Sequence, residues 1–84
     1  MDELHVLRQE IEETDRAIAC LFEKRMFLAS QIGGIKKAQG LPVCDEVREK
    51  QLAETEGTFV SEAVRPYYLR LLREMMALAK EVQA

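Results

Sequence analysis

Apolar residues recur along the first part of the chain at alternating steps of three and four. The positions of this repeat, called the seam below, are Leu4, Leu7, Ile11, Thr14, Ile18, Leu21, Arg25, Leu28, Ile32 and Ile35. An a/d repeat sustained over more than four heptads is typical of a helix that packs along its whole length. The seam therefore predicts one long helix, from about Leu4 to Gln39.

The predicted helix is too long for the rest of the chain to cover. At about 1.5 Å per residue it would run roughly 50 Å. A globule of 84 residues is expected to be about 24 Å across, taken as twice its radius of gyration. We therefore expect a partner molecule to cover part of the seam.

A cation interrupts the seam. Arg25 stands between Leu21 and Leu28, at a position where an apolar residue is usual, and an arginine is rarely buried unless an anion meets it. Lys36 follows eleven residues later, which places it about 20° from Arg25 around an ideal helix. Two cations on one apolar face predict an anion there, either a carboxylate of the protein or a ligand.

Glycines mark the later part of this helix. Gly33 and Gly34 together lower its propensity by about 1 kcal/mol each relative to alanine, so the pair indicates a close backbone approach or a weak point. The seam resumes at Ile35, so we expect the helix to continue. Gly40, with Pro42 beyond it, predicts the helix end.

Two further helices are expected. Asp45 is a good N-cap for a short helix from Glu46 to about Thr55, and Ser61 for a last helix with Pro66 near its first turn. The apolar stripe of the last helix comprises Tyr68, Leu71, Leu72, Met75, Leu78, Ala79 and Val82. The sequence thus predicts an all-α fold of a long, a short and a medium helix, with residues 1–84 as a single domain.

Charge and composition narrow the function classes. Twelve basic against fifteen acidic residues give a net charge of −3, which argues against nucleic acid or an anionic membrane as the main partner. No apolar run approaches the roughly 18 residues of a membrane span, and no signal-peptide pattern is seen, so we expect a cytoplasmic protein. Cys20 and Cys44 do not form a metal-binding spacing, and Cys20 is expected to be buried. There is no phosphate-binding loop or His/Cys cluster, and we expect no cofactor and no metal.

Several short motifs occur in a characteristic order. They are Leu7–Arg8, Glu23–Arg25, the GGIK segment that ends at Lys36, LPVCDEVREK from Leu41 to Lys50, and a last helix that carries Gln83. Each is common alone, but their order and spacing over a three-helix pattern are specific. Over nearly its full length the chain resembles the all-helical, AroQ-class chorismate mutases.

The resemblance implies an intertwined homodimer with two active sites, each shared between both chains. It implies an isomerase that converts chorismate, a dianion, to prephenate by a Claisen rearrangement in phenylalanine and tyrosine biosynthesis. Arg8 would reach into the partner's site, while the home subunit would supply Arg25, Lys36, Asp45, Arg48, Glu49 and Gln83.

The resemblance also implies a role for each of these side chains. The three arginines would hold the substrate carboxylates, and Lys36 and Gln83 would donate to the ether oxygen. Glu49, with Asp45 beside it, would accept from the ring hydroxyl and orient Arg48. Two departures bear on affinity: Ala79 stands where some members have a serine, and Gln83 lies almost at the chain end, where a frayed turn would weaken its role.

Other interpretations remain open at this point. Arg8 could form a solvated salt bridge with Glu12 or Asp15, and Asp45, Arg48 and Glu49 could form an ordinary charged surface. The same scaffold could act as an isochorismate pyruvate lyase. The chain could instead be a helical dimerisation or adaptor module in which Arg25 only specifies register, or a weak domain that needs a partner enzyme of the shikimate pathway.

Overall fold

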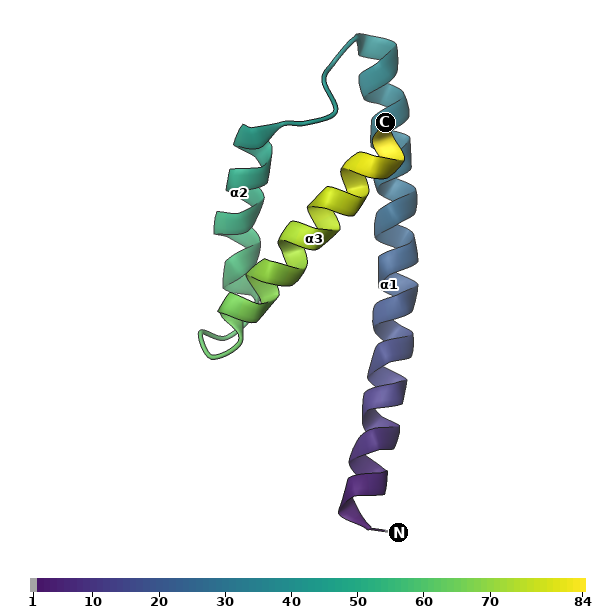
Figure 1. Ribbon diagram of the computed structural model, residues 1–84, viewed down its shortest axis with the longest axis vertical. Helices are drawn as coiled ribbons and strands as arrows, with labels where there is room; N and C mark the ends of the chain where they lie inside the picture. The colour runs from purple at the N-terminus through teal and green to yellow at the C-terminus, as the bar shows by residue number, and fades with distance from the viewer. Residues whose placement is uncertain (1) are drawn as a thin grey trace.

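A computed structural model describes residues 2–84 of the chain (Figure 1). Its elements are the helices α1 (Glu3–Gln39), α2 (Glu46–Glu56) and α3 (Arg65–Gln83), with a short 3₁₀ helix, η1 (Gly57–Phe59), between α2 and α3. Residues 2–84 contain no strand. The all-α class and the order of a long, a short and a medium helix are therefore confirmed.

Helix α1 has clear caps at both ends. The side chain of Asp2 accepts a hydrogen bond from the His5 backbone N–H at 2.7 Å. Gly40 ends the helix in the left-handed conformation, with φ of 68°, and its N–H donates to the Lys36 and Lys37 carbonyls. A side chain is strained at such a φ, which explains the glycine. The helix continues through Gly33 and Gly34, as predicted.

The length of α1 dominates the shape of the molecule. The chain measures 57 × 25 × 15 Å, and its radius of gyration is 16.1 Å. A compact chain of this length would have a radius of gyration of about 12 Å. In Figure 1 the N-terminal half of α1 extends beyond the other helices, which lie beside its C-terminal half.

The second helix begins where the sequence predicts. Asp45 is the N-cap of α2, and its Oδ1 accepts from the Arg48 backbone N–H at 3.0 Å. The segment before it, residues 41–45, is non-helical. After η1, the Arg65 side chain donates to the Gly57 carbonyl at 2.7 Å and to the Val60 carbonyl at 3.3 Å. Arg65 thereby holds the turn that reverses the chain into α3.

The predicted start of the third helix was wrong. Ser61 does not cap α3; its carbonyl accepts from the N–H groups of Val64 and Arg65, which closes a turn instead. The N-cap is Val64, with no side-chain hydrogen bond. Pro66 lies in the first turn, where its missing N–H costs no intrahelical bond, and the helix begins beside it.

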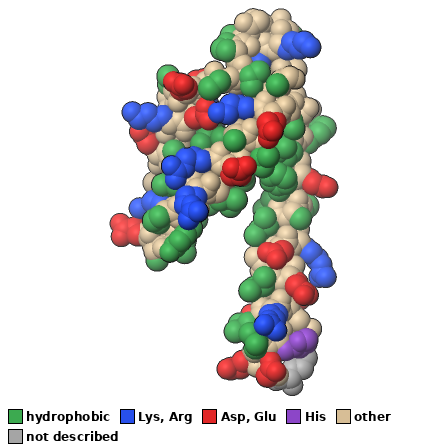
Figure 2. Space-filling model, viewed as in Figure 1, with side chains coloured by type: hydrophobic (Ala, Val, Ile, Leu, Met, Phe, Trp, Pro, Cys, Tyr) green, Lys and Arg blue, Asp and Glu red, His purple; other side chains and the backbone are tan. Residues whose placement is uncertain are grey.

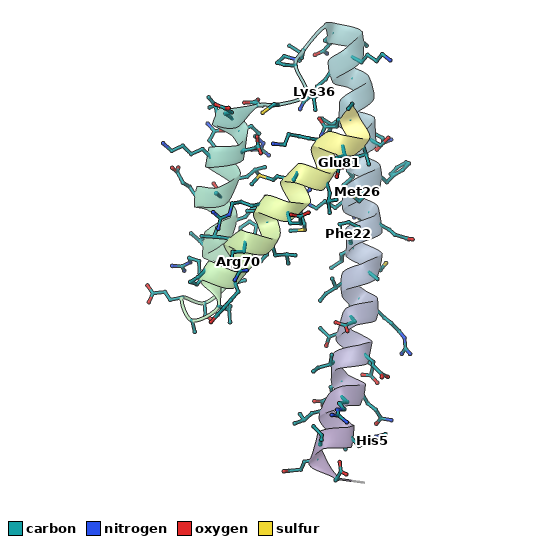
Figure 3. The ribbon with its side chains drawn as sticks, viewed as in Figure 1. His5, Phe22, Met26, Lys36, Arg70 and Glu81 are labelled. Carbon is teal, nitrogen blue, oxygen red and sulfur yellow. The ribbon has the colours of Figure 1, made fainter. Side chains whose placement is uncertain are left out.

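The core that the chain builds for itself is small. The buried apolar residues are Ala29, Leu72, Met76 and Ala79, and Leu72 alone among residues 2–84 has a fully buried side chain. On α1 the buried and half-buried residues, apart from Arg25, each follow a seam position by one residue. This set, called the inner stripe below, comprises Phe22, Met26, Ala29, Gly33 and Lys36. Figure 3 shows Phe22, Met26 and Lys36 on the half of α1 that α3 approaches.

The apolar seam residues of α1 remain exposed along its whole length. From Leu4 to Ile35 their exposed fractions are between 45% and 65%. Every residue from 3 to 21 is exposed, including Cys20. The predicted burial of Cys20 was wrong because no other helix of residues 2–84 packs on this half of α1. Figure 2 shows hydrophobic side chains along this free half. None of the helices formed by residues 2–84 is both long and apolar enough to span a membrane.

Candidate active site

A pocket of about 420 Å³ lies between the C-terminal half of α1, α2 and α3. Its polar lining consists of Arg25, Lys36, Asp45, Arg48, Glu49, Glu56, Lys80 and Gln83. Its apolar lining consists of Leu28, Ala29, Ile32, Val43, Leu52, Met76 and Ala79. The structure therefore brings together all six site residues that were expected from the home subunit, although they come from three helices and the N-cap of α2.

Arg8 does not line this pocket. It lies on the exposed half of α1, seventeen residues before Arg25, which is about 25 Å along the helix axis. Within residues 2–84 it forms no ion pair with Glu12 or Asp15, the local partners considered above. Its contribution to the pocket of a second chain stays a prediction.

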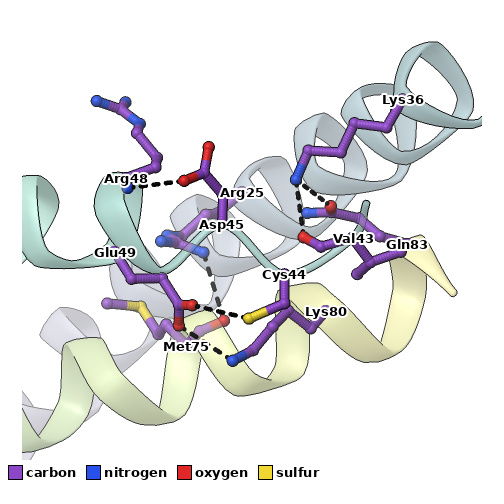
Figure 4. Close-up of polar contacts among 10 residues, drawn as sticks. All are labelled: Arg25, Lys36, Val43, Cys44, Asp45, Arg48, Glu49, Met75, Lys80 and Gln83. Atoms are coloured by element: carbon purple, nitrogen blue, oxygen red, sulfur yellow. Dashed lines mark hydrogen bonds and ion pairs between the residues drawn. The ribbon is translucent and has the colours of Figure 1, made fainter. Parts of the chain in front are cut away.

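Lys36 and Gln83 meet at one end of the pocket (Figure 4). The Lys36 ammonium donates to the Gln83 Oε1 at 2.9 Å and to the Val43 carbonyl at 2.9 Å. These two acceptors fix the Lys36 side chain between α1, α3 and the connector before α2. Because Oε1 of Gln83 accepts from Lys36, its Nε2 is left as the donor of that amide.

Glu49 pairs with Lys80, a residue that the sequence analysis missed. The Lys80 ammonium lies 3.1 Å from Glu49 Oε1 and joins α3 to α2. The hydrogen bond to Glu49 raises the pKa of Lys80. The other carboxylate oxygen, Oε2, accepts a weak hydrogen bond from the Cys44 thiol at 3.6 Å. The guanidinium of Arg48 points away from Glu49 in Figure 4, so the expected Glu49–Arg48 contact is not present.

Arg25 lines the pocket and reaches α3. Its guanidinium donates to the Met75 carbonyl at 3.5 Å, a long hydrogen bond. Burial raises the pKa of nearby Tyr68, and the Glu56 carboxylate raises it further, whereas the positive charge of Arg25 acts in the opposite direction. Arg25, Glu56 and Tyr68 are therefore close enough to interact electrostatically.

The pocket holds more positive than negative charge, although the chain as a whole is acidic. Four cations, Arg25, Lys36, Arg48 and Lys80, line it together with three carboxylates, those of Asp45, Glu49 and Glu56. Within residues 2–84 only Lys80 has a carboxylate within 4.0 Å. The other three cations line the pocket with no carboxylate of residues 2–84 within 4.0 Å, an arrangement suited to an anionic ligand.

Lys80 and Glu56 could have been found from the sequence. Lys80 precedes Gln83 by three residues, so the two side chains share a face of α3. Glu56 follows Glu49 by seven residues, which is two helical turns. Helical periodicity predicts which face of its own helix each residue occupies. It does not predict that Lys80 pairs with Glu49, because residues on different helices have no fixed spacing in the sequence.

A second hollow, of about 520 Å³, lies on the outer side of α3. All the residues that line it, Tyr67, Arg70, Leu71, Arg73 and Glu74, come from this one helix. No other element contributes a functional group, so this surface offers less to a small ligand than the pocket between the three helices.

Comparison with known proteins places the chain in a family. Residues 7–84 match the model of the family described as chorismate mutase type II. The bifunctional chorismate mutase/prephenate dehydratase of Aquifex aeolicus is 32% identical over 92 aligned residues, which cover 99% of this chain and 25% of that protein. The T-protein of Haemophilus influenzae is 32% identical over 83 residues, covering 92% of this chain and 22% of that protein.

A solved structure has the same fold. The conserved hypothetical protein Pfu-1581948-001 from Pyrococcus furiosus superposes with a TM-score of 0.83 at 31% identity, and the match covers 100% of this chain and 99% of that one. The chain spans about a quarter of the length of the curated relatives it matches. The family match extends over nearly every residue of this chain and includes all of those that line the pocket. The chain therefore belongs to the chorismate mutase type II family.

Proposed function

We propose that this protein is an isomerase that converts chorismate to prephenate, acting as a homodimer with two shared sites. The observation that carries the proposal is the set of three cations, Arg25, Lys36 and Arg48, that line one pocket without carboxylate partners in residues 2–84. Membership of the family supports the choice of substrate. The reaction serves phenylalanine and tyrosine biosynthesis.

The residues suit a reaction that needs positioning and charge. The Claisen rearrangement is a single pericyclic step, with no proton transfer and no covalent intermediate. The protein has to hold the compact conformer in which the reacting carbons meet. It also has to place positive charge where the breaking C–O bond leaves negative charge on oxygen.

In this proposal the arginines bind the two carboxylates of chorismate. Arg25 and Arg48 do so from the home subunit, and Arg8 of the partner subunit completes the set. A guanidinium can hold a carboxylate through two parallel hydrogen bonds, which also fixes its orientation. The lining from one chain carries four cations and three carboxylates, a net charge of +1. Arg8 of the partner subunit would raise the net charge of each pocket to +2. That charge matches a dianion.

Lys36 and Gln83 stabilise the developing charge on the ether oxygen. The 2.9 Å hydrogen bond between them supports this assignment, because it orients the Gln83 amide with Nε2 free to donate. Donors fixed before the reaction lose little energy to reorganisation in the transition state. Glu49 accepts from the ring hydroxyl through Oε2, while Lys80 holds Oε1; Asp45 lies beside it.

The exposed seam supports the homodimer. The isolated chain has an accessible surface of 6898 Å². A compact monomer of 9.6 kDa is expected to expose about 5,100 Å². If two chains each buried the difference, the interface would total about 3,600 Å², which lies in the range of obligate dimers. A second copy that lies along the seam would also bring its Arg8 half towards the first chain's pocket.

The test is an assay of the purified protein on chorismate. The loss of chorismate absorbance should be accompanied by prephenate, identified by chromatography. The matched control is Lys36→Ala, which should lower kcat by about 10²–10³-fold or more while circular dichroism stays helical. Absence of turnover would overturn the proposal, and pyruvate release from isochorismate would point to the lyase instead. A kcat of Lys36→Ala equal to that of the unsubstituted protein would contradict the assigned site.

A further inference from the structure

Gly33 lies where the end of α3 touches α1. A Cβ atom built at Gly33 would lie 2.8 Å from Cα of Gln83, and 3.0 Å from its Cβ and Cγ. All three nearest atoms thus belong to a single residue, and that residue carries a functional amide of the pocket. At Gly34, one position along, a Cβ would meet nothing within 4 Å. The two neighbouring glycines therefore have different surroundings.

The backbone of α3 cannot avoid a side chain at position 33 by a rotamer change. The closest atom is the Cα of Gln83, so relief requires a movement of the helix end itself. Ordinary contact begins at 3.4 Å, which means a displacement of about 0.6 Å or more. A shift in that direction lengthens the 2.9 Å hydrogen bond from Lys36 to Gln83 Oε1 towards the limit of a hydrogen bond.

We propose that Gly33 is a positioning residue for Gln83. It allows the last turn of α3 to approach α1 so closely that the Gln83 amide reaches Lys36 and faces the pocket. The catalytic part of this inference rests on the proposed function, because there Gln83 donates to the ether oxygen. The structural part does not depend on the substrate.

Helix propensity does not distinguish Gly33 from Gly34. Both lie inside α1, so each lowers the stability of that helix by a similar amount. Only Gly33 is buried, and only Gly33 lies against another helix. Gly34 therefore provides a matched control at the adjacent position of the same helix.

The catalytic test compares Gly33→Ala with Gly34→Ala. A displacement on the scale of 1 Å can cost about 10²-fold in rate, so Gly33→Ala should lower kcat by up to that factor. Gly34→Ala should keep the kcat of the unchanged protein. In a Gln83→Ala background, Gly33→Ala should cause little further loss, because its effect acts through the side chain that is already absent. A full additional loss there would overturn the assignment.

A second measurement does not need activity. In ¹⁵N NMR spectra, Gly33→Ala should move the Gln83 side-chain amide resonance and speed hydrogen exchange of the backbone amides of residues 80–83. Gly34→Ala should leave both unchanged. Unchanged Gln83 signals in Gly33→Ala would overturn the inference whether or not the protein turns over chorismate. A different result would count against the proposed function alone: the unsubstituted protein does not turn over chorismate, but Gly33→Ala still displaces the Gln83 signals.

A third variant covers the case in which Gly33→Ala folds poorly. Gln83→Gly removes two of the three crowded atoms, Cβ and Cγ, and leaves Cα. Because a glycine itself destabilises a helix, Gln83→Gly alone is the reference for the double variant. The loss of Tm caused by Gly33→Ala should be smaller in the Gln83→Gly background than in the unsubstituted protein. An equal loss in both backgrounds would show that the Gln83 side chain takes no part in the crowding.

Discussion

Two faces of α1 differ in what covers them. The seam is apolar along nearly the whole helix, yet its apolar residues stay 45–65% exposed. The inner stripe, displaced by one residue, contains the buried residues of α1, Ala29 and Gly33, and Gly33 lies against the end of α3. Hydrophobicity alone therefore does not decide which face the chain covers for itself. Small residues that allow a close helix approach decide it here.

The inner stripe also explains why only half of α1 is covered. Extended towards the N-terminus with the same spacing, it would run through His5, Arg8, Glu12, Asp15 and Ala19. That half is polar, whereas Phe22, Met26, Ala29 and Gly33 are apolar or small. The seam shows no such change: its other positions are apolar in both halves, and Thr14 and Arg25 are its two polar positions. We infer that α3 uses the stripe and that a second copy of the chain uses the seam.

The largest expected effect comes from a charge placed in the seam. Leu21, at 65% exposed, belongs to the seam, and Phe27, at 64% exposed, lies on the outer face of the same helix. In the single chain the two are equally accessible.

Leu21→Lys should dissociate the proposed dimer and abolish turnover, because the charge would be buried against the partner. Phe27→Lys should leave both unchanged. Analytical ultracentrifugation would detect a fall towards the 9.6 kDa of one chain, and the same mass for both variants would contradict the assignment of the seam.

The next largest effect tests whether the free half of α1 serves the other chain. Arg8→Ala and Arg48→Ala should each be nearly inactive alone. Mixed and allowed to exchange subunits, half of the dimers are heterodimers with one complete site each, so about one quarter of the full activity should return. The exchange is verified by mass spectrometry of the intact dimers. No recovery despite exchange would place Arg8 outside the partner's site.

Much of the fold could be predicted from residues whose effect on the backbone is local. Gly40 and Asp45 fix helix ends through their own backbone geometry and capping bonds, so their roles were predicted correctly. Ser61 was assigned wrongly, because a serine can equally close a turn through its carbonyl, and Pro66 sets the start of α3. The burial of Cys20 was wrong because it assumed that the chain covers its own N-terminal half.

The site was predictable to the extent that it depends on which helix face a residue occupies. Arg25 attracted attention because it interrupts an apolar repeat, and the structure places it in the pocket with Lys36. The Glu49–Lys80 pair and the contact of Gly33 with Gln83 were not predicted. Both depend on how closely two helices approach, and that distance is set by tertiary packing rather than by a repeat in one segment.

A third prediction concerns the covered half of α1, where Lys36 meets Gln83. In Gln83→Glu the new carboxylate would lie beside the Lys36 ammonium, which favours its charged form and lowers its pKa below the usual value of about 4.3. A carboxylate cannot donate to the ether oxygen, so activity at neutral pH should fall by about 10²–10³-fold. It should rise as pH falls, by about tenfold per unit, as the carboxyl becomes protonated. The control, Gln83→Ala, should stay low at every pH. A flat profile for Gln83→Glu would rule out donation from this position.

The smallest expected effect concerns α2, which has no buried residue and is joined to α3 by the ion pair of Glu49 with Lys80. The partner raises the pKa of Lys80 above its usual 10.5, so the pair favours folding fully below that pH and is lost as pH rises through the raised pKa. Lys80→Met should lower Tm slightly at pH 7, less than any substitution in the core, and the difference should vanish at high pH. The control is Lys50→Met, an exposed lysine of α2 without an ion pair in residues 2–84. Equal melting curves for both variants at pH 7 would show that the ion pair does not stabilise the packing of α2 against α3.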